Sequence, residues 1–176
     1  MSNQVLENKK IAILATNGFE DSELTEPRDA VAEAGATVVV IAPEAGTIEG
    51  KKGAKVDVDQ TTADANASDF DALILPGGTD NADHIRMDEA AVKFVRELTQ
   101  AGNPVGTICH GAWILTDAEA LSGVTVTSFP SLKTDLKNAG ATWVDKEVVV
   151  DKRIVSSRTP ADLPAFNTAI VKEFAK

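Results

Sequence analysis

The sequence predicts an α/β fold in which a doubly wound, mostly parallel sheet is sandwiched by helices. Short, continuous apolar runs, typical of strands buried on both faces, alternate along the chain with segments whose apolar residues recur at helical spacing. Such alternation favours strand–helix–strand units around a parallel sheet. With 176 residues, of which 43% are hydrophobic, the chain can bury a complete core. We therefore expect one domain over residues 1–176, with a polar, flexible N-terminus at residues 1–9.

The first half of the chain predicts three buried strands. Proline or glycine ends most of the segments, because neither residue continues regular structure well. Gly35 follows the first predicted helix and suits its C′ position. In order, we expect a strand at 11–15, a loop at 16–21, a helix ending at 34–35, a strand at 37–42, a turn-rich excursion at 47–53, a half-exposed strand at 55–59 and a strand at 72–75 that Pro76-Gly77-Gly78 cuts off.

The second half continues the alternation and closes with a helix. The segment 88–101 is amphipathic, because Val92, Val95 and Leu98 share one helical face. In order, we expect this helix, a strand at 105–108, a helix at 112–121, a strand at 124–127, a helix at 131–138 followed by Gly140, strands at 148–150 and 154–156, and a helix at 163–174.

Composition and charge exclude several classes of function. The net charge of −10 argues against nucleic acid as a partner, since its backbone recruits clusters of lysine and arginine. The pair Lys51-Lys52 is too short to reverse that conclusion. We find no apolar segment long enough for a membrane span or a signal peptide. One cysteine forbids an intrachain disulfide, and the ligands of a zinc cluster are lacking. We expect a cytoplasmic protein without a metal or another cofactor.

Cys109, the single cysteine, lies where the predicted strand at 105–108 turns into a helix. Such a bend is a nucleophile elbow, which projects one reactive side chain above a parallel sheet. The N-terminus of the helix would lower the pKa of the thiol and favour the thiolate. The alternative is a buried structural cysteine, which is the commoner fate of a lone cysteine.

Two further loops could complete a site with Cys109, because sites in such folds gather at the carboxyl ends of the strands. Gly77 and Gly78 could direct backbone N–H groups at an oxyanion, together with the amides near Gly111, or could simply form a tight turn. The loop at 16–21 leads into an acidic helix start. Most of its carboxyls are expected to cap the helix, but one lying beside the sulfur would share a proton with it. These acidic residues are Glu20, Asp21, Glu23 and Glu26.

The chain has two histidines, and one of them directly follows the cysteine. Neighbours along a helix do not face each other, so a hydrogen-bonded pair of Cys109 and His110 depends on the strained turn. The alternative is a histidine packed in the crevice of the sheet without a catalytic role. His84 is expected to be an exposed residue of a loop.

Four segments, taken together and in order, resemble the ThiJ/PfpI superfamily. The resemblance covers about residues 11–174 and is strongest to the PfpI-like intracellular protease/amidase branch. This branch is related to class I glutamine amidotransferases and to the Parkinson's-associated protein deglycase, and it implies a flavodoxin-like sheet. The segments are Phe19-Glu20-Asp21-Ser22-Glu23-Leu24, Leu75-Pro76-Gly77-Gly78, Ile108-Cys109-His110-Gly111 and Ser157-Arg158-Thr159-Pro160-Ala161-Asp162-Leu163-Pro164-Ala165-Phe166.

The resemblance implies roles for individual residues. Cys109 would be the nucleophile, and His110 matches the histidine that follows it in the PfpI branch. Glu23 would contact the sulfur of the nucleophile, with Glu20 as its rival for that place.

The resemblance also implies a homo-oligomer, a dimer or a hexamer. PfpI proteases take a third carboxylate from a neighbouring subunit, and Asp83 stands at that position, three residues before Arg86. The archetype has glutamate there, and aspartate is one methylene shorter. Phe129 stands where some relatives have a tyrosine, and this chain contains no tyrosine.

Three functions are compatible with these residues. The leading hypothesis is a stress-related PfpI-type hydrolase, a protease or amidase, which attacks a peptide or small amide through Cys109. The alternative is a cofactor-independent glyoxalase or deglycase, in which the same sulfur adds to an aldehyde such as methylglyoxal and a carboxylate moves protons. The third is a redox sensor or chaperone that depends on oxidation of Cys109.

Overall fold

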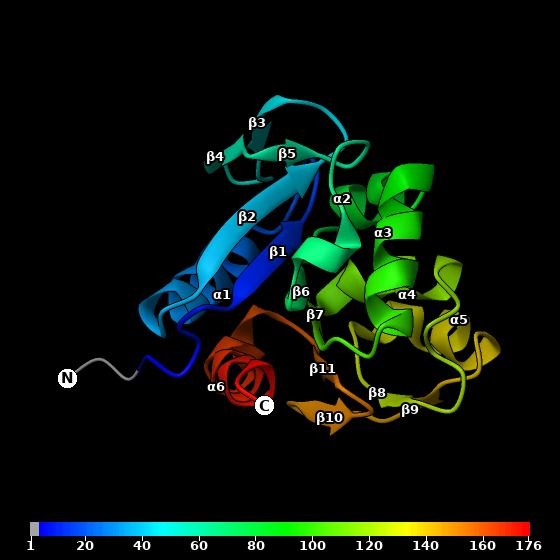
Figure 1. The fold of residues 1–176 in the computed structure, drawn as a ribbon. Coiled ribbons are helices and arrows are strands. Elements are labelled where there is room, and N and C mark those ends of the chain that lie inside the picture. Colours follow the sequence, from blue (N-terminus) through cyan, green and yellow to red (C-terminus); the bar gives the residue numbers. More distant parts are fainter. Residues whose placement is uncertain (1–3) are drawn as a thin grey trace.

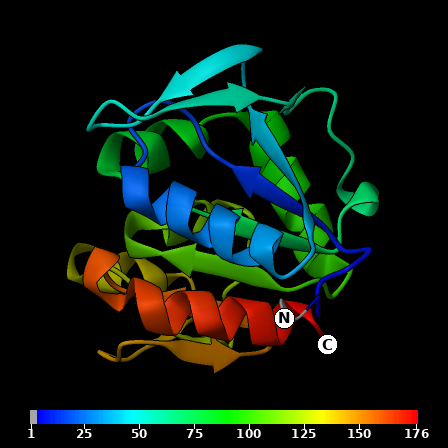
Figure 2. The same cartoon turned by 90° about the vertical axis from the view of Figure 1, so that its left-hand side faces the viewer.

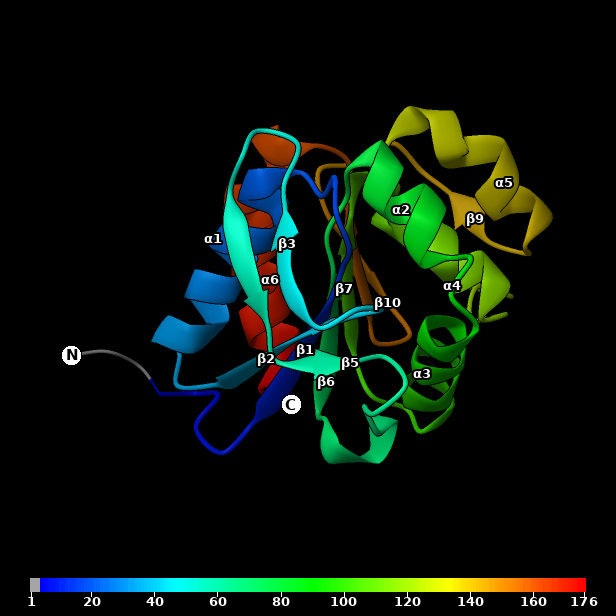
Figure 3. The ribbon, with the colours of Figure 1, turned by 90° about the horizontal axis from the view of Figure 1, so that it is seen from above.

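The computed structural model describes residues 4–176 and confirms the predicted fold class. A seven-stranded sheet lies between two layers of helices, with α1 and α6 on one face and α2, α3, α4 and α5 on the other (Figures 1 and 3). The helices are α1 (Asp21–Glu33), α2 (Thr79–Ile85), α3 (Glu89–Gln100), α4 (Trp113–Asp117), α5 (Lys133–Asn138) and α6 (Leu163–Phe174).

The sheet has the order β10-β11-β7-β6-β1-β2-β5, and all of its pairings are parallel except that of β10 with β11. Strand order reverses beside β1, since β2 is added on one side of it and β6 on the other. The strands are β1 (Lys10–Leu14), β2 (Thr37–Ala42), β5 (Gln60–Thr61), β6 (Ala72–Leu75), β7 (Val105–Ile108), β10 (Val149–Asp151) and β11 (Ile154–Ser157).

Alternate residues of the central strands enter two separate cores. In β1, Ala12 and Leu14 pack with α3 and α4, whereas Ile11 and Ile13 pack with α1 and α6. All four side chains are almost completely buried. A strand covered on both faces has no polar side, and this explains why its sequence is a continuous apolar run.

Two small sheets lie outside the central one. The segment expected as a turn-rich excursion at 47–53 contains β3 (Gly46–Glu49), which pairs antiparallel with β4 (Lys55–Val58). This hairpin lies across one end of the molecule (Figure 2). Its strand was not predicted because only Ile48 of β3 is buried, so the apolar pattern is weak. The expected strand at 124–127 is reduced to β8 (Thr125–Val126), which pairs with β9 (Thr142–Trp143).

Two helices differ from the prediction. The helix α2 was not expected, because its sequence buries only Ala82 and Ile85 as apolar residues and carries no clear helical period. The helix expected at 112–121 is shorter: α4 ends at Asp117, and Glu119 has a left-handed backbone with φ of 57°. Such a conformation cannot continue a right-handed helix.

The N-terminal segment is packed over its described part. A flexible segment is expected at 1–9; residues 4–9 contact the rest of the chain, and residues 1–3 lie outside the described chain. Leu6 is fully buried, and its backbone N–H donates to the carbonyl of Ala34 at 2.9 Å. The apolar contact of one leucine and this hydrogen bond hold the segment against the end of α1.

Three loops meet at the carboxyl ends of adjacent parallel strands. They follow β1, β6 and β7, which are neighbours in the sheet. Because parallel strands end at the same edge, the loops beginning at Ala15, Pro76 and Cys109 are brought together there. The fold thus places the acidic helix start, the glycine turn and the cysteine in one region.

Candidate active site

Cys109 occupies a strained bend between β7 and a 3₁₀ turn, Cys109–Ala112. Its φ of 62° lies in the left-handed region, which costs a non-glycine residue roughly 1–3 kcal/mol. The backbone N–H of Phe129 donates to the Cys109 carbonyl at 3.1 Å and helps to hold the bend. A Cβ at Gly111 would lie 2.3 Å from the Leu75 carbonyl oxygen, so only glycine lets the turn approach β6. The backbone geometry is that of a nucleophile elbow.

Glu23 is the carboxyl beside Cys109. It is fully buried at the start of α1, and its Oε1 accepts a hydrogen bond from the Gly77 N–H at 2.9 Å. Within residues 4–176, its Oε2 is buried without a hydrogen-bond partner. A Cβ at Gly77 would lie 2.3 Å from Glu23 Oε1 and 2.7 Å from Cys109 Cβ. Gly77 is therefore the residue that allows the carboxyl, the turn and the elbow to meet.

The environment of Glu23 favours its protonated form. Burial raises its pKa to about 8, and the negative charge of Glu20 acts in the same direction. Opposing contributions come from the Gly77 N–H, the Lys51 ammonium and the Cys109 thiol. Near neutral pH this carboxyl therefore carries a proton that it can donate.

Burial also raises the pKa of the Cys109 thiol, and the charge of an ionised Glu23 raises it further. The backbone N–H groups of His110 and Gly78 and the Lys51 ammonium lower it. The expected low pKa of the thiol thus does not hold. The N–H groups of the short turn and the Lys51 ammonium lower the pKa by less than burial, and then the Glu23 charge, raise it. With both pKa values raised, both groups hold their protons near neutral pH, so the thiol must give its proton to a neighbouring base before the sulfur reacts.

Glu20, the rival carboxyl, faces two lysines instead of the sulfur. Lys51 and Lys52 lie in the turn between β3 and β4, and both form ion pairs with Glu20, the Lys52 Nζ at 2.9 Å from Oε1. Burial acts to raise the pKa of Glu20, but the hydrogen bonds with the two lysines outweigh it and the pKa is lowered. Glu20 is therefore the charged member of the acidic pair. The sequence did not predict this contribution of Lys51, because it depends on the unpredicted hairpin.

His110 contacts two aromatic rings. Its ring stacks on Phe129 with centroids 4.7 Å apart, and it meets Trp113 edge to face at 5.6 Å. Its Nδ1 lies 3.3 Å from Cys109 Sγ, and its Nε2 lies 3.3 Å from Ser131 Oγ. Burial, and then the Lys51 ammonium, lower the pKa of the imidazole, so the ring is neutral near pH 7.

These side chains border a cavity of about 300 Å³. Of the three predicted glycines Gly78 lines the cavity, whereas Gly77 and Gly111 do not, and the N–H of Gly77 is already bonded to Glu23. Asp83 lies on the exposed side of α2 and does not line this cavity. The lining residues are Glu20, Glu23, Lys51, Gly78, Thr79, Cys109, His110, Phe129, Thr159 and Pro160.

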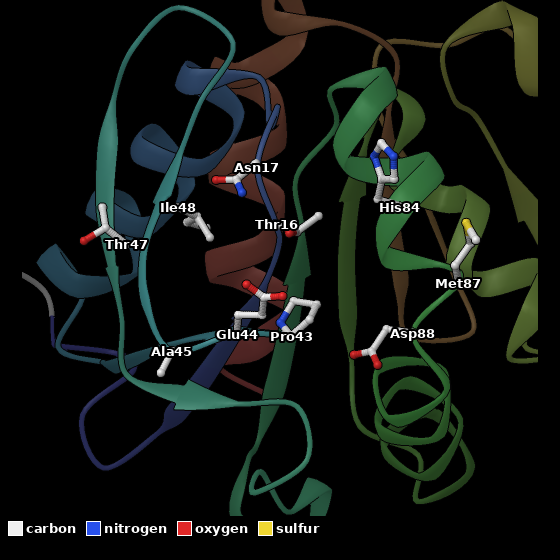
Figure 4. Close-up of a pocket in the computed structure, with 10 residues that line it drawn as sticks. All are labelled: Thr16, Asn17, Pro43, Glu44, Ala45, Thr47, Ile48, His84, Met87 and Asp88. Carbon is white, nitrogen blue, oxygen red and sulfur yellow. The ribbon is translucent and has the colours of Figure 1, made fainter.

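A larger cavity of about 520 Å³ lies between the β3–β4 hairpin and α2 (Figure 4). It contains no nucleophile and is bordered by Glu44, His84, Met87 and Asp88 among others. His84 lies on α2 rather than in the expected loop, and its Nδ1 lies 2.7 Å from the Asp80 carbonyl oxygen. The reactive groups thus gather in the smaller of the two cavities.

Over residues 4–176 no group of three histidine, cysteine, aspartate or glutamate side chains is arranged to hold a metal ion. None of the helices in this range combines the length and apolar character needed to cross a bilayer.

Comparison with known proteins identifies the family. A profile described as the DJ-1/PfpI family matches residues 9–173. The chain belongs to the DJ-1/PfpI family. Protein/nucleic acid deglycase 2 of Escherichia coli is 47% identical over 163 residues, which cover 91% of this chain and 94% of the relative. YraA of Bacillus subtilis, named as a candidate cysteine protease, is 48% identical over 161 residues, or 91% and 95% of the two chains.

The fold of the family is also found in a solved structure. Schizosaccharomyces pombe DJ-1 superposes with a TM-score of 0.84 over 93% of this chain and 90% of its own, at 17% identity. At that level of identity the likeness concerns the fold alone.

Proposed function

We propose that this member of the DJ-1/PfpI family is a cysteine-dependent deglycase that acts on methylglyoxal and on the adducts it forms with thiols and amines. It is an enzyme of the hydrolase or deglycase type. The observation that carries the proposal is the buried Glu23 carboxyl beside Cys109, whose Oε2 has no hydrogen-bond partner among the described residues. Burial raises the pKa of this carboxyl to about 8. An aldehyde reaction needs this combination of a nucleophile and a group that both gives and takes a proton.

The proposed reaction begins when the Cys109 thiol gives its proton to His110 Nδ1, 3.3 Å away, and the sulfur bonds to the aldehyde carbon. The aldehyde oxygen takes the Glu23 proton in the same step. The Glu23 carboxylate then removes the remaining hydrogen of that carbon as a proton. Return of a proton to the adjacent carbon converts the resulting enediol to a lactoyl thioester. Water cleaves the thioester into lactic acid and the thiol, and the proton held by His110 returns to Glu23. One water is consumed, and no oxidant or reductant is needed. The N–H groups of Gly78 and His110, which point toward the sulfur, would hold the developing oxyanion.

The size of the cavity supports a small substrate. About 300 Å³ lies at the lower end of the range for ligand pockets and accommodates a three-carbon oxoaldehyde readily. Lys51 and Glu20 line the cavity as an ion pair, and the Lys51 side chain is half exposed.

The test is conversion of methylglyoxal to lactate by the purified chain. We expect Cys109→Ala to abolish it and Glu23→Gln to lower kcat at least 100-fold, as for loss of a general acid or base. Glu173→Gln is the matched control, since Glu173 is also buried but pairs with Arg153 at the end of α6. Full lactate production by Glu23→Gln would refute the proposal.

A second candidate, peptide or amide hydrolysis, is favoured by the 3.3 Å separation of Cys109 Sγ and His110 Nδ1. In that reaction His110 would take the thiol proton and return it to the leaving nitrogen. Its orientation could come from Asp83 of a second copy in a homo-oligomer, because Asp83 is exposed on α2. Cleavage of a peptide amide that is lost in Cys109→Ala and reduced in Asp83→Asn, with no lactate from methylglyoxal, would favour this function.

A further inference from the structure

We propose that Ser131 orients His110 for proton exchange with Cys109, so that the cysteine, histidine and serine form one hydrogen-bonded series within a single subunit. Ser131 is a positioning residue, because it touches the imidazole and not the sulfur. The inference rests on the proposed function only in assuming that His110 serves the chemistry of Cys109.

The geometry places the two ring nitrogens between a sulfur and a hydroxyl. Nδ1 lies 3.3 Å from Cys109 Sγ, and Nε2 lies 3.3 Å from Ser131 Oγ. When Nε2 carries the hydrogen and donates it to Ser131, the lone pair of Nδ1 faces the thiol and can take its proton. After transfer both nitrogens are donors, and the hydroxyl oxygen still accepts from Nε2. Ser131 therefore suits the ring both before and after the proton moves.

The surroundings leave the ring little other freedom. Phe129 stacks on one face of the imidazole, and Trp113 makes an edge-type contact with the ring, with centroids 5.6 Å apart. Phe129 and Ser131 belong to the same short segment, which the Phe129 N–H ties to the Cys109 carbonyl. Leu132, the next residue, is fully buried and anchors the segment from the other side. One segment thus delivers both the stacking ring and the hydroxyl.

The pKa of His110 distinguishes a hydroxyl partner of Nε2 from a carboxylate partner, because the two differ in charge. Lys51 approaches from the β3–β4 turn, Glu23 lies across the cavity, and the Arg86 guanidinium from α2 lies over Trp113, 5.1 Å from its centroid. A neutral hydroxyl at Nε2 adds no charge, whereas a carboxylate there would raise the pKa of the imidazole by about one unit or more.

The experiment is nitrogen NMR of the two imidazoles in the full chain, with His84→Gln to assign the signals of His110. We expect the neutral ring of the wild type to carry its hydrogen on Nε2. In Ser131→Ala we expect a mixture of tautomers and a fall in kcat of about three- to tenfold at unchanged KM, as for loss of one hydrogen bond. Ser131→Thr keeps the hydroxyl and should restore both the Nε2 tautomer of His110 and the wild-type kcat. Ser131→Asp should raise the pKa of His110 by about one unit or more and shift the acid limb of the pH–rate profile with it.

Ser122→Ala is the matched control, because it removes an exposed serine away from His110. It should change neither the tautomer nor the pKa of His110. Unchanged tautomer and pKa in both Ser131→Ala and Ser131→Asp would overturn the inference. It would also be overturned if Asp83→Asn changed the His110 signals and Ser131→Ala did not, since a carboxylate from a second copy would then hold the ring. The expected NMR changes in a chain that converts neither methylglyoxal nor a peptide would uphold the role of Ser131 and refute the proposed function.

Discussion

Replacing Glu23 with glutamine should remove a large pH dependence of stability. The variant keeps an oxygen that can accept from the Gly77 N–H, but it cannot ionise. In the folded chain burial, and then the charge of Glu20, raise the pKa of Glu23 from 4.5 to about 8. Between these pH values the folded state holds a proton that the unfolded chain has released. The free energy of unfolding of the wild type therefore falls as the pH rises through this range.

The size of the effect follows from the two pKa values. A rise from 4.5 to about 8, at about 1.4 kcal/mol per pKa unit, gives a change of at most about 5 kcal/mol. We expect the stability of Glu23→Gln relative to wild type to increase by several kcal/mol between pH 4.5 and pH 8.5. Most of the increase should be complete near pH 8.

The assay is urea unfolding of both proteins, followed by circular dichroism at several pH values between 4.5 and 8.5. The ionisable groups common to the two proteins contribute about equally to both free energies of unfolding. The difference between these free energies therefore reports the ionisation of Glu23. A constant difference across this range would refute the reasoning, because it would mean that Glu23 ionises as readily in the folded chain as in the unfolded one. A decrease with rising pH would give the opposite sign and refute it as well.

Three other perturbations follow from the structure. Lys51→Met removes a cation that lowers the pKa of the Cys109 thiol, so iodoacetamide labelling of the cysteine should shift to higher pH; unchanged labelling would contradict this. Gly77→Ala should destabilise the chain by about 1–3 kcal/mol and abolish activity, because the new Cβ collides with the site; an active variant of normal stability would rule that out. Leu6→Ala should lower the free energy of unfolding by about 2–5 kcal/mol, whereas Val5→Ala, at a residue 40% exposed, should change it by less than about 0.5 kcal/mol; equal effects would show that the N-terminal segment is not packed.

The parts of the fold that could be predicted are those with strong local patterns. The strand at 37–42 was predicted with its observed bounds, because a strand buried on both faces must be apolar throughout. The apolar face of 88–101 predicted the helix α3. The loop at 16–21 and Gly35, which suits the C′ position, predicted the two ends of α1. The strand β3 and the helix α2 were not predicted. Each buries too few apolar residues to produce a recognisable hydrophobic period in the sequence.

The sequence by itself determined that Cys109 follows a buried strand and that a glycine turn and acidic residues follow neighbouring strands. Parallel strands end at one edge, so these loops had to meet. Only the tertiary structure decided which carboxyl lies beside the sulfur. Glu20 and Glu23 are both acidic and three residues apart, but the hairpin brings two lysines to Glu20, while Glu23 is buried against Gly77. Desolvation and charge pairing depend on contacts distant in the chain, and they assign opposite ionisation states to two residues that the sequence presents alike.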